Sequence, residues 1–242
     1  MKKLSKTSEL LWVLGTVFLA LGVSLCSKAD LGVSMIAAPS FVISEALGGD
    51  VPFLTTGVTG YLIQGVLLAL LCVVIRRFNW RFLLAFASGV IYGYVLDLFL
   101  WLWGDINFSS VALRWVMLFA GNTLSAFGIA CFFRTYLPLQ VFELFVSEVS
   151  KKFSLAVVKT KWCFDLSLLA VSVALTLVLF GDGMDFDWTS IYRGSFHSVG
   201  LGTIVTAFMN SPMIALSGKL IDKVTDSSPR LEKMASLLEI KE

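Results

Sequence analysis

Long runs of apolar residues alternate with short polar segments, and this pattern predicts helices that cross a membrane. A membrane-spanning helix needs about 20 apolar residues. The runs that meet this length are 9–27, 54–75, 80–103, 111–133, 161–181 and 195–217. The chain is 57% hydrophobic and 15% charged, whereas soluble domains average about 45–50% and about 25%. We therefore expect an all-α polytopic membrane protein with six transmembrane helices.

Two further apolar segments are too short or too interrupted to cross. The first, 31–47, meets Pro39 midway, and the second, 137–153, contains Pro138 and Glu143. Irregular backbone survives at membrane depth only where protein shelters it or where it lines a water-filled cavity. We interpret both segments as re-entrant hairpins, which enter and leave the membrane on the same face.

The distribution of positive charge supports this topology. Lys and Arg concentrate on the cytoplasmic side of membrane proteins. If neither short segment crosses, only Lys28, Arg114 and Arg193 of the 19 Lys and Arg residues lie outside. We expect a multi-pass protein of a bacterial-type inner (plasma) membrane, with both termini in the cytoplasm.

The two halves of the chain align without gaps, which predicts an internal repeat. The matched pairs are Gly15 with Gly121, Gly22 with Gly128, and Lys28 with Arg134. The first half-repeat is 1–105 and the second is 106–242, ending in a cytoplasmic tail over 218–242. Because three crossings separate the halves, the second would be inverted in the membrane, an arrangement typical of secondary transporters. Glycine spacing of this kind also occurs in ordinary packed transmembrane helices.

Composition narrows the function classes. A net charge of +2 without a basic stripe argues against nucleic-acid binding. The four cysteines lie within apolar runs, which indicates packing rather than disulfides. The sequence has no metal-binding cluster and no nucleophile–base pair, so we expect neither an enzyme nor a cofactor.

Four motifs resemble those of the YczE/YitT-like integral membrane proteins. They are "ADLG" at Ala29–Gly32, "VLD" ending at Asp97, "VKTKWCFD" ending at Asp165, and "GLGTIVTAFMNSP" at Gly200–Pro212. The chain departs from the family where "SMIAAP" follows the first motif and where Ser211 replaces a usual glycine. The resemblance implies the same membrane architecture and a transport-like role, but it does not identify a substrate.

Three carboxylates are candidates for binding a substrate or an ion, because ionisable groups inside membranes cost about 2.5–3.5 kcal/mol to insert. Glu143 lies inside the second short segment, where no packing role explains it. Asp97 lies late in the third span, where external water could also reach it. Asp165 lies one turn into the fifth span, where pairing with a nearby lysine is the alternative.

Uncharged polar residues complete the candidate site. Thr203, Thr206 and Asn210 share one face of the last span. Pro212 would interrupt the backbone there and free carbonyl groups for a ligand. Polar contacts between helices would explain the same residues. Further candidates are Ser34, Gln64 and Asn122.

These features predict a secondary transporter that works by alternating access with proton or sodium coupling. The helix N-termini of the two hairpins would favour a small organic solute with an anionic group. A non-transporting accessory or regulatory protein of a partner complex, and a passive channel, are the alternatives. We expect a monomer or homodimer in the lipid bilayer.

Overall fold

The computed structural model describes residues 7–104, 106, 108–181, 199–226 and 228. These residues form eight helices: α1 (Ser8–Lys28), α2 (Ala38–Leu47), α3 (Thr56–Ile75), α4 (Arg81–Trp103), α5 (Val111–Phe132), α6 (Val141–Lys152), α7 (Val157–Phe180) and α8 (Leu201–Val224). Six of them, all except α2 and α6, are long and apolar enough to cross a membrane. The all-α class and the six predicted spans are therefore confirmed.

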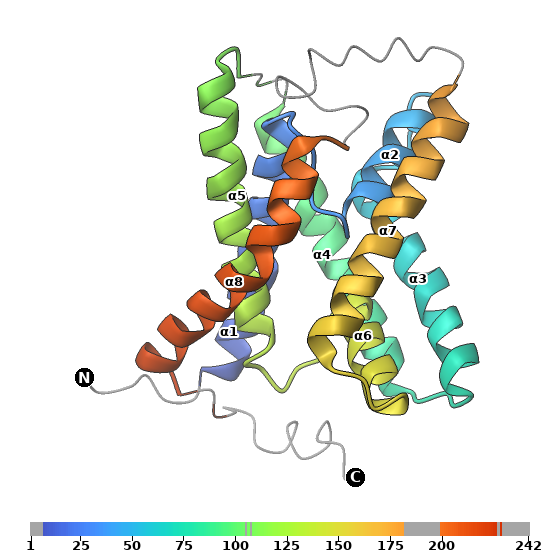
Figure 1. Cartoon of the computed structure of the whole chain (residues 1–242), viewed down its shortest axis with the longest axis vertical. Coiled ribbons are helices and arrows are strands. Elements are labelled where there is room, and N and C mark those ends of the chain that lie inside the picture. Colours follow the sequence, from blue (N-terminus) through green and yellow to red (C-terminus); the bar gives the residue numbers. More distant parts are fainter. Residues whose placement is uncertain (1–6, 105, 107, 182–198, 227, 229–242) are drawn as a thin grey trace.

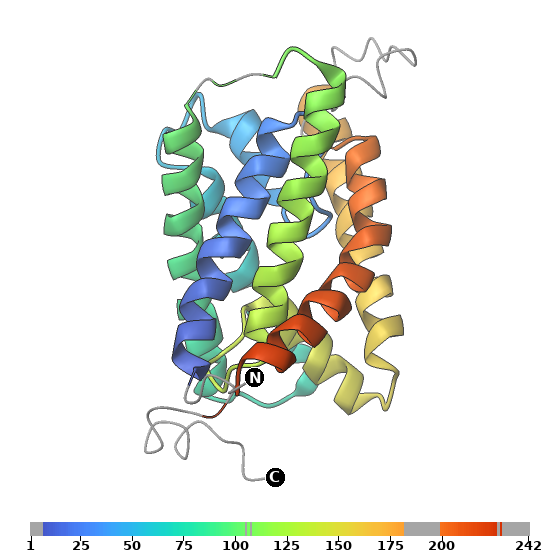
Figure 2. The same cartoon turned by 90° about the vertical axis from the view of Figure 1, so that its left-hand side faces the viewer.

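The helices form two groups joined by α4 (Figure 1). One group contains α1, α5 and α8, which lie side by side in Figure 2. The other contains α2, α3, α6 and α7. The start of α1 and the end of α8 meet at the lower end in Figure 1, where Thr7 Oγ1 donates a hydrogen bond to the Asp226 carbonyl at 2.8 Å.

Glycines bring α1 and α5 into direct backbone contact. A Cβ on Gly121 would lie 2.7 Å from the carbonyl oxygen of Gly22, and a Cβ on Gly128 would lie 2.8 Å from that of Gly15. Any larger side chain at these positions would push the two helices apart. Small residues that permit such close approach are the usual means of joining helices in membranes, where no hydrophobic force acts between them.

The two short helices lie at opposite ends of the second group, α2 in the upper half and α6 in the lower half (Figure 1). Pro39 lies in the first turn of α2. The expected interruption at this residue is therefore the start of a helix, because the first turn of a helix needs no backbone N–H from proline. Pro138 likewise lies outside a helix interior, three residues before α6 begins at Val141.

The last long helix differs from the expected span. Helix α8 runs from Leu201 to Val224 rather than over 195–217, and it continues through Pro212. A proline removes one hydrogen bond from a helix, and neighbouring helices allow transmembrane helices to tolerate it. The expected tail over 218–242 therefore begins as helix, while its residues 229–242 and positions 195–198 lie outside the described residues.

We predict that Gly22→Ala destabilises the protein, because the new Cβ would meet the Gly121 carbonyl and the Ser125 side chain. Overpacking of this kind costs about 1–3 kcal/mol. Thermal unfolding of the purified protein in detergent measures the loss. Gly65→Ala is the matched control, since its Cβ would make only an ordinary 3.4 Å contact with Phe86. Equal stability of the two variants would contradict the proposed role of the α1–α5 contact.

Candidate functional site

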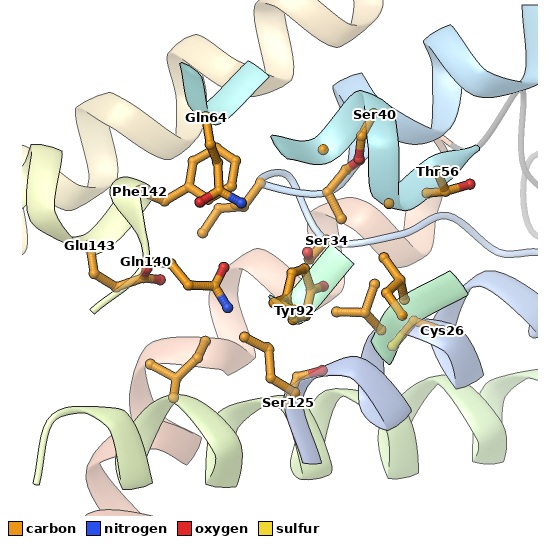
Figure 3. A pocket seen from close by; sticks show the side chains of 18 of the residues that line it. Cys26, Ser34, Ser40, Thr56, Gln64, Tyr92, Ser125, Gln140, Phe142 and Glu143 are labelled. Atoms are coloured by element: carbon orange, nitrogen blue, oxygen red, sulfur yellow. The ribbon is translucent and has the colours of Figure 1, made fainter. Parts of the chain in front are cut away.

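A narrow cavity of about 50 Å³ lies between the two groups of helices (Figure 3). One buried water needs about 10–15 Å³ by this measure, so the cavity has room for a few waters or a very small solute. Among the described residues, every helix except α7 contributes to its lining. Side chains of the polar lining include Ser34, Ser40, Gln64, Asn122, Ser125 and Gln140.

The N-terminal ends of both short helices lie at this central cavity. Ser34, just before α2, lines it and accepts a backbone hydrogen bond from Ala38 N–H at 2.9 Å. Gln140, just before α6, extends into the space near Tyr92 and Ser125 (Figure 3). The lining also includes Gln64 of α3, whose Oε1 accepts the N–H of Val141 at 3.3 Å. The segments expected to be hairpins therefore converge on one place.

Three buried polar atoms of the described residues have no hydrogen-bond partner, and all three belong to residues that line the cavity. They are Ser125 Oγ, Gln140 Nε2 and Asn210 Oδ1. Buried polar groups in native proteins are nearly always satisfied, so unsatisfied ones need a specific explanation. Their concentration around one cavity indicates a place where water or a solute supplies the missing partners.

Glu143 is the one acidic residue among the described residues that line the cavity. It lies in the first turn of α6 and is 8% exposed. Among the described residues, no basic nitrogen lies within 4.0 Å of its carboxylate. Burial raises the pKa of the Glu143 carboxyl, while the positive charge of Lys161 acts in the opposite direction. Lys161 itself forms an ion pair with Asp165 at 2.9 Å.

The structure brings five of the candidate residues together and separates the others from them. The five that line the cavity are Ser34, Gln64, Asn122, Glu143 and Asn210. Asn122 also donates a hydrogen bond from Nδ2 to Met213 Sδ at 3.2 Å. The four described candidates outside its lining are Asp97, Asp165, Thr203 and Thr206.

Each of these four has a local partner. The carboxylate of Asp97 accepts hydrogen bonds from Gly57 N–H at 2.7 Å and from Thr55 Oγ1, so it caps the start of α3. Asp165 forms an ion pair with Lys161, which was the alternative to a role in binding a substrate or an ion. Thr203 Oγ1 accepts the N–H of Gly200 at the start of α8.

The start of α8 also packs against the segment that precedes α2. Gly202 N–H donates to the Leu31 carbonyl at 2.7 Å, and Thr206 Oγ1 donates to the Thr203 carbonyl at 3.1 Å. Thr203 is fully buried. The polar face of α8 is thus divided, because its first part joins α8 to the first short segment and Asn210 faces the cavity.

Sequence reasoning missed two cavity residues that the structure singles out, Gln140 and Ser125. A signal existed for both. Ser125 is three residues after Asn122 and therefore lies on the same face of its helix. Gln140 lies between Pro138 and Glu143, inside the segment already expected to form a hairpin.

A second, wider hollow of about 540 Å³ opens at the upper end of the molecule; we call it the upper vestibule. The residues that line it include Lys28, Ser44, Glu45, Thr56, Asp97 and Leu100. Thr56 also lines the central cavity, and its hydroxyl lies 3.0 Å from that of Ser44. A contact between α2 and α3 therefore separates the vestibule from the cavity.

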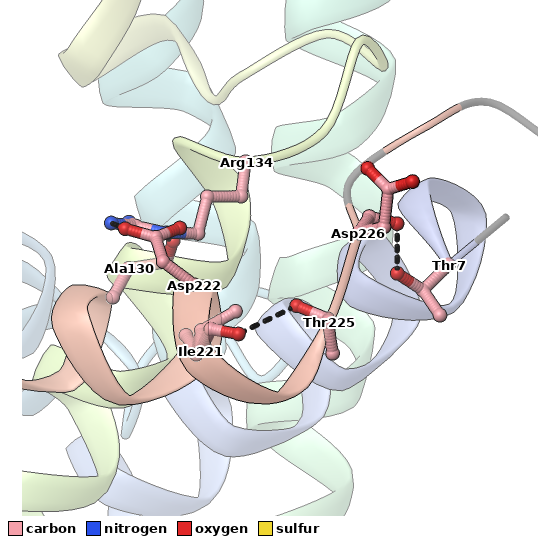
Figure 4. Close-up of polar contacts among 7 residues, drawn as sticks. All are labelled: Thr7, Ala130, Arg134, Ile221, Asp222, Thr225 and Asp226. Carbon is pink, nitrogen blue, oxygen red and sulfur yellow. Dashed lines mark hydrogen bonds and ion pairs between the residues drawn. The ribbon is translucent and has the colours of Figure 1, made fainter. Parts of the chain in front are cut away.

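At the lower end, hydrogen bonds join segments far apart in the chain (Figure 4). Arg134 donates from Nε and Nη2 to the two oxygens of Asp222, at 2.6 and 2.7 Å. The hydroxyl of Tyr136 donates to Glu9 at 2.8 Å. Burial and this hydrogen bond raise the pKa of Tyr136 to about 12, so the phenol remains a donor.

These observations define a polytopic α-helical membrane protein with a small central cavity between six long and two short helices. Among the described residues, no group of three or more His, Cys, Asp or Glu side chains could hold a metal ion. The chain belongs to a family of unknown function (DUF6198), whose family model matches residues 6–219. Neither a curated protein nor a solved structure matches the chain.

We predict that Asp97→Ala lowers stability because it removes the cap of α3. Loss of a helix cap costs about 0.5–2 kcal/mol. Because Asp97 is a charged acceptor, we expect its loss to cost a value toward the top of this range. Asp97→Asn should lose less, since its amide oxygen can still accept from Gly57 N–H. Thermal unfolding in detergent tests whether Asp97→Ala is less stable than Asp97→Asn. An unchanged unfolding temperature for Asp97→Ala would refute the capping role.

Proposed function

We propose that this protein is a secondary transporter of a small polar solute, with the central cavity as its binding site. In this proposal the segments containing α2 and α6 are re-entrant hairpins that enter the membrane from opposite faces. The observation that carries it is that the N-terminal ends of α2 and α6 meet at one cavity, where three buried polar atoms lack partners. Meeting points of broken helices near the middle of the membrane are where secondary transporters bind substrates and coupling ions.

Reciprocal packing between the two halves supports an inverted repeat. Helix α2 packs against α7, and its counterpart α6 packs against α3, the counterpart of α7. The contact of Gly15 with Gly128 likewise becomes the contact of Gly121 with Gly22 when the halves are exchanged. This exchange is what a two-fold axis relating inverted halves would produce. The relation to YczE/YitT-like proteins remains part of this proposal.

The difference between the two ends supports alternating access. The upper vestibule is separated from the cavity by the Ser44–Thr56 contact alone in this proposal, whereas at the lower end the Arg134–Asp222 ion pair holds α5 and α8 together. We infer that the structure is a nearly occluded state that faces the side opposite the termini.

The charge of the cavity restricts the solute. An anionic group, which the sequence led us to expect, has no Lys, Arg or His among the described lining residues to bind it. Glu143 would repel such a group when ionised. The proposal therefore concerns a neutral or cationic solute, and it assigns proton or sodium coupling to Glu143.

Cysteine labelling tests the hairpins. In a cysteine-free background, we predict that Asp30→Cys and Gly49→Cys react with an impermeant reagent only from outside the cell. Phe133→Cys and Phe153→Cys should react only from the cytoplasmic side, because each pair flanks a segment that does not cross. Labelling of the two members of either pair from opposite sides would mean that the segment spans the membrane.

Solute flux tests the transporter itself. We predict that Glu143→Gln abolishes flux driven by a pH gradient in proteoliposomes, since the amide cannot exchange a proton, while insertion and folding persist. Glu148→Gln is the control, because this residue on the same helix pairs with Lys151 at 3.4 Å and is not among the lining residues. The wild-type protein should transport at least one member of a metabolite panel.

The alternatives give different results in the same experiment. No flux for any solute, together with recovery of a defined partner complex, would favour an accessory protein. Flux that neither saturates nor responds to the pH gradient would favour a passive channel. Coupled flux at the wild-type rate in Glu143→Gln would remove Glu143 from the mechanism.

A further inference from the structure

We propose that the solute is a small cation with N–H donors, and that this cation and a proton occupy the Glu143 carboxylate in turn. The protein would then exchange protons for cations across the membrane. This inference rests on the proposed transport function and adds to it the class of substrate and the direction of coupling.

The charges around the cavity leave Glu143 as the group that needs a counter-ion. Helix α6 packs against α3, α4 and α7. On α7 the facing charges are Lys161 and Asp165, which form a 2.9 Å ion pair with each other; Lys161 favours the ionised form of Glu143 and Asp165 opposes it. The nearby titratable groups on α3 and α4 are the phenols Tyr61 and Tyr92, which supply hydroxyls and ring faces rather than charge.

A buried carboxylate without a counter-ion is strongly unfavourable. It becomes neutral in two ways: it binds a proton, or it pairs with a cation. When the cation arrives, its N–H group donates to the carboxylate oxygen, and the carboxyl proton leaves to water. The net charge of the site stays at zero, so each monovalent cation displaces one proton.

The other groups of the cavity suit such a cation. Asn210 Oδ1 and Ser125 Oγ lack partners and can accept N–H donors. Gln140 Nε2 lacks an acceptor, which a water that enters with the solute or a polar atom of the solute would provide. The rings of Phe142, Tyr61 and Tyr92 line the same space and can attract a cation over their faces.

Three matched probes test the charge preference: guanidinium, urea and nitrate, which are flat, branched molecules of similar size. They differ in charge, which is positive, absent and negative. Isothermal titration calorimetry on the full chain in lipid nanodiscs should detect binding of guanidinium and of neither other probe. Titration in buffers of different ionisation enthalpy should show proton release on binding.

The pH dependence has a defined sign. A proton competes with the cation, so the apparent Kd for guanidinium should rise about tenfold for each unit of pH below the pKa of the site, and level off above it. A site that does not exchange protons would show a flat profile. Because this measurement uses the wild-type chain, it does not depend on the folding of any variant.

Variants locate the effect. Glu143→Gln should lose guanidinium binding and proton release, Glu143→Asp should keep both with weaker affinity, and Glu148→Gln should match the wild type. Unchanged guanidinium binding in a folded Glu143→Gln protein would overturn the inference. Absence of guanidinium binding, binding without proton release, or tighter binding of urea or nitrate would overturn it as well.

Failure of this inference is distinguishable from failure of the proposed function. If guanidinium neither binds nor is transported, while a neutral or anionic solute of the panel shows saturable, gradient-driven flux, the cation inference is wrong and the transporter stands. If no solute of any charge is transported in proteoliposomes, both are wrong.

Discussion

The direct contact between the backbones of α1 and α5 is the constraint on which the rest of the structure depends. Inside a membrane, apolar side chains gain little by leaving lipid for protein, so close packing must hold helices together. Gly15, Gly22, Gly121 and Gly128 provide this packing by the absence of side chains. The joined helices then form one wall of the cavity, and α4 and α8 pack against them. A larger residue at these contacts would alter the cavity wall as well as the helix pair.

The short helices are positioned by a different kind of interaction. Each begins in the protein interior, where the free N–H groups of its first turn need acceptors. The Ser34 carbonyl supplies one for α2, and Gln64 supplies one for α6. The same requirement explains Asp97, which reaches from α4 to the first turn of α3. Many polar groups inside this protein therefore accept hydrogen bonds from helix N-termini. The three buried side-chain atoms that have no partner lie at the cavity.

The difference between polar groups that cap helices and polar groups that face the cavity explains how much could be predicted from the sequence. The spans follow from length and apolarity, and the two defective segments follow from their prolines and glutamates, because these are local properties. Glu143 and Asn210 could be selected because a polar residue at membrane depth is costly wherever it lies. The role of Asp97 could not be read in the same way, because its partner Gly57 lies on another helix. Only the fold distinguishes a capping carboxylate from one that faces a cavity.

The position of Glu143 at the start of α6 bears on how a single carboxylate could serve both proton and cation. Burial alone favours the protonated carboxyl, the form that cannot pair with a cation. The helix N-terminus and the positive charge of Lys161 favour the ionised form. Lys161 cannot neutralise Glu143 outright, because it is committed to Asp165. These influences oppose that of burial, and an exchanger of the proposed kind needs a carboxyl that can release a proton and take it back.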